Sequence, residues 1–366
     1  MANGFCPAAL THINTLTECA SPMVKVTPSG FLKMLLDKRQ TADVTSFKDD
    51  GMGHVKDVSF KYAPRLLDTQ TDTAASCDPN LQSAWSEASI PDPTLFRQIG
   101  IYIDAADMSK YCADASATVM VGKEPTRFMN EFIDQVKRMA NALIVAIDKD
   151  LLTKQLANFG RNARTGSNAA ATLNFPLDAT VNNLAQGIAL LLSDMSVNEA
   201  CNDYSIVGSG LFNNFDKQQF LKGLASNGVD TSKWNDYTFY HDINASTVWG
   251  ANQIGVFENK AVQLIDINKN NLFTGMDTGA SQLFSMTLPL ECCAGGYDSL
   301  TFDAQLKFID CPTEVNIGGV PTTKNKGWVL TLGKAFDLWN IPAAAYQATD
   351  RLYLNNGTYR YAVTNT

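Results

Sequence analysis

The sequence predicts an α+β fold, and three observations support this prediction. A helical pattern continues without a break over residues 124–159. Segments 54–66 and 95–107 alternate apolar and polar residues, as strands with one buried face do. Helical and strand patterns then alternate over residues 175–290, and strand patterns dominate over 291–366. The chain therefore combines one very long helix with several strand-rich regions.

The composition excludes several classes of protein. The chain has 366 residues, a net charge of −8 and no long run of Lys or Arg, so a protein that reads DNA or RNA sequence is not indicated. With 45% hydrophobic residues it is globular, whereas only 18% are charged. A surface poor in charge and rich in neutral polar groups is easily buried between subunits. The first residues lack the basic start and apolar core of a signal peptide.

Residues 1–53 are expected to form an arm, irregular except for a short helix in "SGFLKMLLDKRQ". The two alternating segments that follow flank a long polar stretch, which predicts an extended β-hairpin over residues 54–107. Such a hairpin has little core of its own. We therefore expect it to pack on something outside its own subunit.

The helix over 124–159 has clear ends and one apolar face. Pro125 suits a first helical position, and Gly160 suits a left-handed residue that ends a helix. At about 1.5 Å per residue the helix is roughly 50 Å long, which spans a whole domain. Charged residues interrupt every apolar run, so it is not a membrane span. The expected apolar stripe consists of Met129, Ile133, Val136, Ala140, Ile144, Ile147 and Leu151.

The remaining segments continue the α+β pattern. Residues 161–174 are expected to be a soft linker, and residues 177–195 a second amphipathic helix. The sequences "YSIVGSG", "TFYHDI", "NQIGVFENKAVQLID" and "LFSMTLPL" indicate strands, and "FNNFDKQQFLKG" a third helix. After residue 291 the pattern is mostly strand, with "NNG" as a hairpin turn.

In this order of elements, and in wording such as "YSIVGSGLFNN", "NQIGVFENKAVQLID" and "WNIPAAAYQATDRLYLNNGTYRY", the chain resembles the major capsid proteins of tailed bacteriophages. These have the Hong Kong 97-type shell fold, which encapsulins share. The resemblance implies an N-terminal arm (1–53), an extended loop (54–107), a peripheral domain with a spine helix at 124–159 (108–174), an axial domain (175–290) and return strands of the peripheral domain (291–366).

The resemblance also implies a function. The chain would be a structural protein without catalytic residues or cofactors, self-assembling through hexamers and pentamers into an icosahedral shell. That shell would enclose double-stranded DNA without sequence-specific binding, and no membrane would be involved. Separate scaffolding, portal and decoration proteins would be its partners. Its location would be the virion capsid, assembled in the host bacterial cytoplasm. The alternatives are an encapsulin-like protein compartment, or another virion component such as a tail-tube subunit.

One segment offers a weak candidate for a metal site. Asp266, Asn268, Asn270 and Asp277 in "DINKNNLFTGMD" occupy positions one, three, five and twelve of a calcium-binding loop. The sixth position is not Gly, the twelfth is not Glu and no helices are predicted on either side, so a polar turn is the competing interpretation.

Histidine and cysteine chemistry finds little support. A hydrolase that uses His241 with Asp242 is a further alternative, but adjacent strand residues point to opposite faces. No cysteine spacing fits a zinc site, and we expect reduced thiols. The eight cysteines are Cys6, Cys19, Cys77, Cys112, Cys201, Cys292, Cys293 and Cys311.

Overall fold

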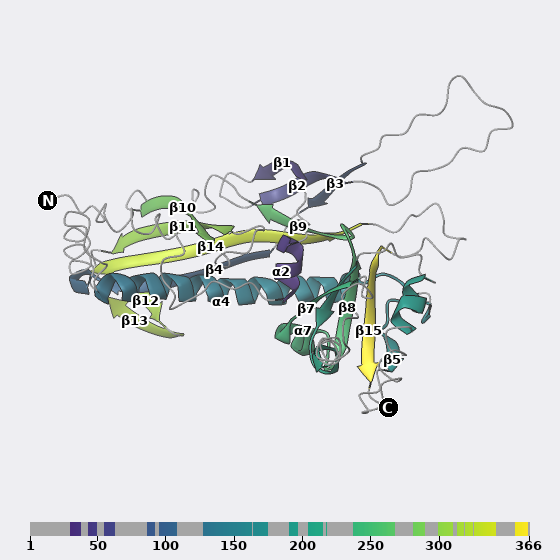
Figure 1. Ribbon diagram of the computed structural model, residues 1–366. Helices are drawn as coiled ribbons and strands as arrows, with labels where there is room; N and C mark the ends of the chain where they lie inside the picture. The colour runs from purple at the N-terminus through teal and green to yellow at the C-terminus, as the bar shows by residue number, and fades with distance from the viewer. Residues whose placement is uncertain are drawn as a thin grey trace, which may run out of the picture.

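The structure is a computed structural model of the whole chain, shown in Figure 1. It describes residues 30–37, 43–49, 55–62, 86–91, 95–107, 127–162, 164–174, 190–196, 204–214, 217, 237–267, 281–289, 299–309, 313–317, 319–324, 326–341 and 356–364. The α+β class predicted from the sequence is confirmed.

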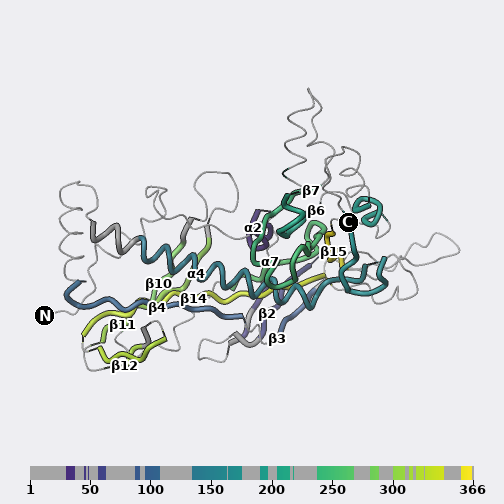
Figure 2. The backbone as a smooth tube through the Cα atoms, turned by 90° about the horizontal axis from the view of Figure 1, so that it is seen from below, coloured from purple at the N-terminus to yellow at the C-terminus, as the bar shows by residue number. Residues whose placement is uncertain are grey.

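One long helix lies along the largest sheet. Helix α4 (Arg127–Asn158) is unbroken over 32 residues, which confirms the predicted single helix and gives a length of about 48 Å. It runs beside strand β14 (Gly327–Asn340) along the molecule, as both views show (Figures 1 and 2). We call α4 the spine helix.

The first sheet is built around β14. Its order is β10-β11-β14-β4, and β9 also pairs with β14, on the side of β11 and beyond the end of that strand; all these pairings are antiparallel. The strands are β4 (Leu95–Asp104), β9 (Val262–Ile267), β10 (Ser281–Pro289) and β11 (Ser299–Ile309). Apolar residues of β4, β11 and β14 share one core with the apolar stripe of the spine helix.

The second sheet lies at the C-terminal end of the spine helix (Figure 1). Its strand order is β5-β15-β8-β6-β7, with both parallel and antiparallel pairs. Its strands are β5 (Ala171–Asn174), β6 (Tyr204–Gly208), β7 (Tyr237–His241), β8 (Gln253–Glu258) and β15 (Thr358–Thr364). Helix α7 (Ile243–Val248) follows β7, and residues 190–196 and 211–214 are also helical. The described part of 175–290 thus contains both helices and strands, and its two predicted helices are described only in part.

Three smaller elements complete the described chain. Strands β1 (Asp43–Asp49), β2 (Val55–Tyr62) and β3 (Ser86–Pro91) form a separate antiparallel sheet. Strands β12 (Thr313–Ile317) and β13 (Val320–Lys324) form a two-stranded sheet. Helix α2 (Gly30–Asp37) confirms the short helix predicted in the arm, and all its apolar residues are buried.

The predicted pairing of the extended hairpin is wrong. Strand β2 (55–62) does not pair with β4: β2 lies between β1 and β3, and β4 pairs with β14. Alternation of apolar and polar residues identifies a strand with one buried face, but it does not identify the partner strand. The sequence also gave no expectation of a strand at β1.

Three predicted segment boundaries do not match the division of the strands between the two sheets. Strands β9 and β10, expected within the module at 175–290, belong to the first sheet. Strand β15, expected with the returning strands at 291–366, belongs to the second. The soft linker expected at 161–174 contains strand β5, which pairs in parallel with β15. The chain crosses between the sheets at places that local pattern does not mark.

Candidate functional site: the spine helix and its junctions

The spine helix is held to the first sheet by an apolar stripe with ion pairs beside it. Val136, Ala140 and Ile144 are fully buried in the core that contains residues of β11 and β14. Of the predicted stripe, Ile147 and Leu151 are buried as well, whereas the side chains of Met129 and Ile133 lie outside the described residues. This packing makes the helix and the sheet one rigid body, since well-packed interiors deform little.

An ion pair joins β4 to the spine helix. The guanidinium of Arg97 donates two hydrogen bonds to Asp150, with Nε–Oδ2 at 2.5 Å and Nη2–Oδ1 at 2.7 Å. The hydrogen bond and the negative charge of Asp150 raise the pKa of Arg97. Half of the Arg97 side chain is exposed, so this pair contributes at most about 1 kcal/mol. Its bidentate geometry sets the position of β4 more than the total stability.

The C-terminal end of the spine helix joins both sheets. The carbonyl of Asn158 accepts hydrogen bonds from Asn340 Nδ2 of β14 at 3.2 Å and from Asn356 Nδ2, beside β15, at 2.9 Å. The N–H of Gly160 then donates to the carbonyl of Thr358 at 3.0 Å. Side chains from two sheets thus satisfy the end of one helix.

Gly160 does not have the predicted left-handed conformation. Among the described glycines, those with positive φ are Gly166, Gly210, Gly250, Gly319 and Gly357. The reason for glycine at 160 is space. A Cβ there would lie 2.9 Å from the carbonyl oxygen of Thr358 and would collide with the side-chain oxygen of Asn356. The backbone of the joint passes too close for any side chain.

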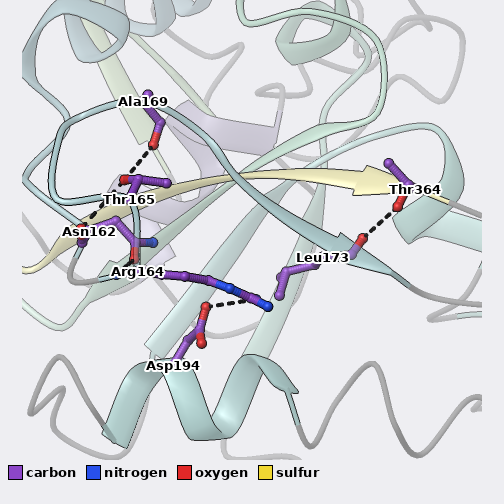
Figure 3. Close-up of polar contacts among 7 residues, drawn as sticks. All are labelled: Asn162, Arg164, Thr165, Ala169, Leu173, Asp194 and Thr364. Carbon is purple, nitrogen blue, oxygen red and sulfur yellow. Dashed lines mark hydrogen bonds and ion pairs between the residues drawn. The ribbon is translucent and has the colours of Figure 1, made fainter.

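The turn after the spine helix is ordered by polar contacts, shown in Figure 3. Asn162 pairs with Ser167 across the turn. Arg164 forms an ion pair with Asp194 of the 190–196 helix at 3.4 Å (Figure 3). Burial raises the pKa of Asp194, whereas the charge and hydrogen bond of Arg164 act to lower it. Further along, Thr364 of β15 donates to the carbonyl of Leu173 in β5 at 3.3 Å (Figure 3). These contacts fix the path of the chain between the spine helix and the second sheet.

The base of the extended loop rests on its own subunit. Val58 and Phe60 of β2 are fully buried against Ile265 of β9 and Trp339 of β14. The rings of Phe60 and Trp339 meet edge to face at a centroid distance of 4.9 Å. Strands β2 and β3 of the expected hairpin therefore pack on their own subunit, whereas the sequence led us to expect packing outside it. Residues 63–85 lie outside the described residues.

The weak metal candidate is only partly described. Asp266 lies in β9, where its carboxylate forms an ion pair with Lys334 of β14. Asn268, Asn270 and Asp277 lie outside the described residues, so the calcium loop stays a prediction. In the part of the chain that the structure describes, no group of three His, Cys, Asp or Glu side chains could hold a metal ion.

His241 and Asp242 point apart, as their adjacent positions predicted. His241 is exposed, whereas Asp242 is buried and caps helix α7 by accepting a hydrogen bond from Asn244 N at 2.8 Å. All eight cysteines lie outside the described residues. Within the described ranges, no helix is both long and apolar enough to cross a bilayer.

One buried polar residue of the spine helix was not predicted to belong to a site. Asp148 is fully buried on the apolar face of α4, four residues after Ile144 and three before Leu151. A carboxylate at this spacing on an apolar stripe was the available signal. Figure 1 shows α2 lying against this part of the spine helix, near the second sheet.

No family model and no curated protein matches the sequence. Solved structures that align with nearly the whole chain include one of Mycobacterium phage Adephagia, at 10% identity and a TM-score of 0.49, covering 97% of this chain and 98% of that one. The Cyanophage A-1(L) capsid asymmetric unit matches at 10% identity and a TM-score of 0.44, covering 95% of each chain. The virus-like particle from Pyrococcus furiosus matches at 7% identity and a TM-score of 0.37, covering 98% and 97%. The second of these is a phage capsid, the class that the sequence resembles. At these values the matches assign no function to this chain.

Proposed function

We propose that this chain is the major capsid protein of a tailed bacteriophage. Many copies self-assemble into an icosahedral shell that encloses double-stranded DNA. The observation that supports this most is the 32-residue spine helix packed along β14, with a second sheet at its end. A subunit in a thin shell needs to be stiff, so that force is transmitted between its distant edges. A long helix packed along a sheet forms such a stiff plate.

The separate β1–β3 sheet supports the proposal from another side. It stands apart from both large sheets and anchors on β9 and β14 through one apolar face. In this proposal, residues 63–85 between β2 and β3 contact a neighbouring copy. Contacts of this kind are heterologous, and repeated around rings they close a shell. Each contact can be weak, because each subunit makes several.

The roles implied by the resemblance follow from this proposal. Residues 1–53 act as the arm, and residues 54–107, apart from β4 in the first sheet, act as the extended loop. The first sheet and spine helix form the peripheral domain, and the second sheet with its helices forms the axial domain. The protein has no enzymatic activity, resides in the virion, and is assembled in the host bacterial cytoplasm with scaffolding, portal and decoration proteins.

Electron microscopy of the purified recombinant protein tests the proposal. We expect closed particles of uniform diameter, formed by the chain alone or with a scaffolding protein. Sedimentation separates particles from free subunits, and Ile144→Ala in the spine helix should reduce the particle fraction more than its exposed neighbour Val145→Ala. Uniform monomers under every condition of pH, salt and concentration would overturn the assignment.

The alternatives give different outcomes in the same preparation. An encapsulin-like compartment would form shells that hold protein and no nuclease-protected DNA when isolated from their natural source. A tail-tube subunit would form rings or open tubes rather than closed shells. A hydrolase would be a small discrete oligomer whose turnover is lost in His241→Ala.

A further inference from the structure

The first turn of helix α2 contacts two buried carboxyl groups. The N–H of Phe31 donates to Asp242 Oδ2 at 2.8 Å, and the N–H of Leu32 donates to Asp148 Oδ1 at 3.1 Å. Gly30 is packed so closely that an added Cβ would lie 2.7 Å from the Cβ of Asp242. The first turn of α2 is thus held by one carboxyl group from the spine helix and one from the end of β7.

The two carboxyl groups also contact each other and share a third partner. Asn244 donates its backbone N–H to Asp242 Oδ1 at 2.8 Å and its side-chain Nδ2 to Asp148 Oδ2 at 3.0 Å. Asp148 and Asp242 are exposed by 0% and 1%, and their shared donor, Asn244, holds the two carboxyl groups close together. Two negative charges this close repel each other when both are out of water, which favours a proton on one of them.

The surroundings favour that proton. Burial, and then the negative charge of Asp242, raise the pKa of Asp148 to about 7, while the hydrogen bonds from Asn244 and Leu32 act in the opposite direction. The donors in the cluster are neutral amides, so none of them cancels a second negative charge. The other titratable groups on the elements packed here are Lys33 and Asp37 of α2, Tyr204 of β6, Tyr237, Tyr240 and His241 of β7, Asp266 of β9, and Arg127, Glu131, Asp134, Lys137, Arg138, Lys149, Asp150 and Lys154 of α4. Lys149 and His241 are exposed.

We propose that Asp148 holds a proton beside Asp242 and that the two residues form a pH-sensitive latch, which holds α2 on the junction and loosens when the proton is lost. Helix α2 contacts the spine helix, β9 of the first sheet, and β6 and β7 of the second. Loosening the latch therefore detaches α2 from both parts of the subunit at once. The proposal concerns a single subunit and does not depend on the proposed function.

Hydrogen–deuterium exchange of the full chain tests the latch. The readout is the protection of amides in 30–37 at pH 6 and pH 8.5, corrected for the intrinsic pH dependence of exchange, with β14 amides as internal reference. Losing the proton from a group with a pKa of about 7 should make opening of α2 about tenfold more frequent over this interval. The variant Asp148→Asn stays neutral and keeps an acceptor for Leu32 N–H, so its protection should not change with pH. Asp150→Asn, whose ion pair with Arg97 lies outside the cluster, should behave as the wild type.

Two results would overturn the latch. One is equal protection of α2 in the wild type at both pH values. The other is a pH dependence that persists unchanged in Asp148→Asn. If that variant does not fold, the wild-type comparison of α2 with β14 decides alone, and the infrared carbonyl band of a protonated carboxyl group, expected at pH 6 and absent at pH 8.5, provides an independent check.

Discussion

Replacing Ile144 by Ala tests whether the spine helix stiffens the subunit through its buried stripe. Ile144 is fully buried in the core between α4 and the first sheet. The change removes three carbons, which at about 0.8 kcal/mol each lose about 2.4 kcal/mol of transfer free energy. The cavity left in a rigid interface adds to this, so the total loss should be about 3–4 kcal/mol, within the usual range for such changes.

The neighbouring residue supplies a matched control. Val145 is also β-branched and lies one position further along α4, but it is 41% exposed. Val145→Ala should change the free energy of unfolding by about 0.5 kcal/mol or less. Urea unfolding followed by circular dichroism measures both variants, and the difference should appear in the transition midpoint at equal slope. If the two variants unfold at the same urea concentration, the described packing of the spine helix is wrong.

Three further predictions concern the junctions. Gly160→Ala should cost about 1–3 kcal/mol in urea unfolding because its Cβ meets the Thr358 carbonyl, whereas Gly100→Ala in β4, with no neighbour nearer than 3.4 Å, should cost less. Phe60→Ala should destabilise the subunit by about 3–5 kcal/mol; equal stability of this variant and the wild type in calorimetry would mean that β2 does not pack on its own sheet. The raised pKa of Asp148 means that the folded state binds its proton more tightly than the unfolded state, so this contribution is full below pH 4 and is lost as pH rises through about 7. Relative to Asp148→Asn, the wild type should lose about 4 kcal/mol over that window in unfolding experiments at stepped pH, and parallel curves would contradict this.

The calcium loop remains open to a simple experiment. Asp266 already pairs with Lys334, which leaves the loop with fewer charges for a cation. If the predicted site binds calcium, adding the ion raises the melting temperature and a chelator reverses the rise. An unchanged melting temperature would leave the segment as a polar turn.

Much of the candidate site followed from local pattern. The spine helix was predictable because its apolar residues recur every three or four positions, a period that only one face of a helix can bury. The short helix α2 and the opposite orientations of His241 and Asp242 were predictable for the same kind of reason. Strands β2 and β4 were found by alternation, although not their partners.

By itself, then, the sequence determined the spine helix, α2 and strands such as β2 and β4, but not β1 or β5, because these patterns depend on residues close together in the chain. Only the tertiary structure decided that β4 pairs with β14, that β15 joins the second sheet, and that Gly160 is required by a neighbouring backbone. It also brought Asp148, Asp242 and the first turn of α2 together across 211 and 116 positions of sequence. Pairing and charge clustering depend on distances between remote segments, and these are set by how whole layers pack rather than by any local periodicity.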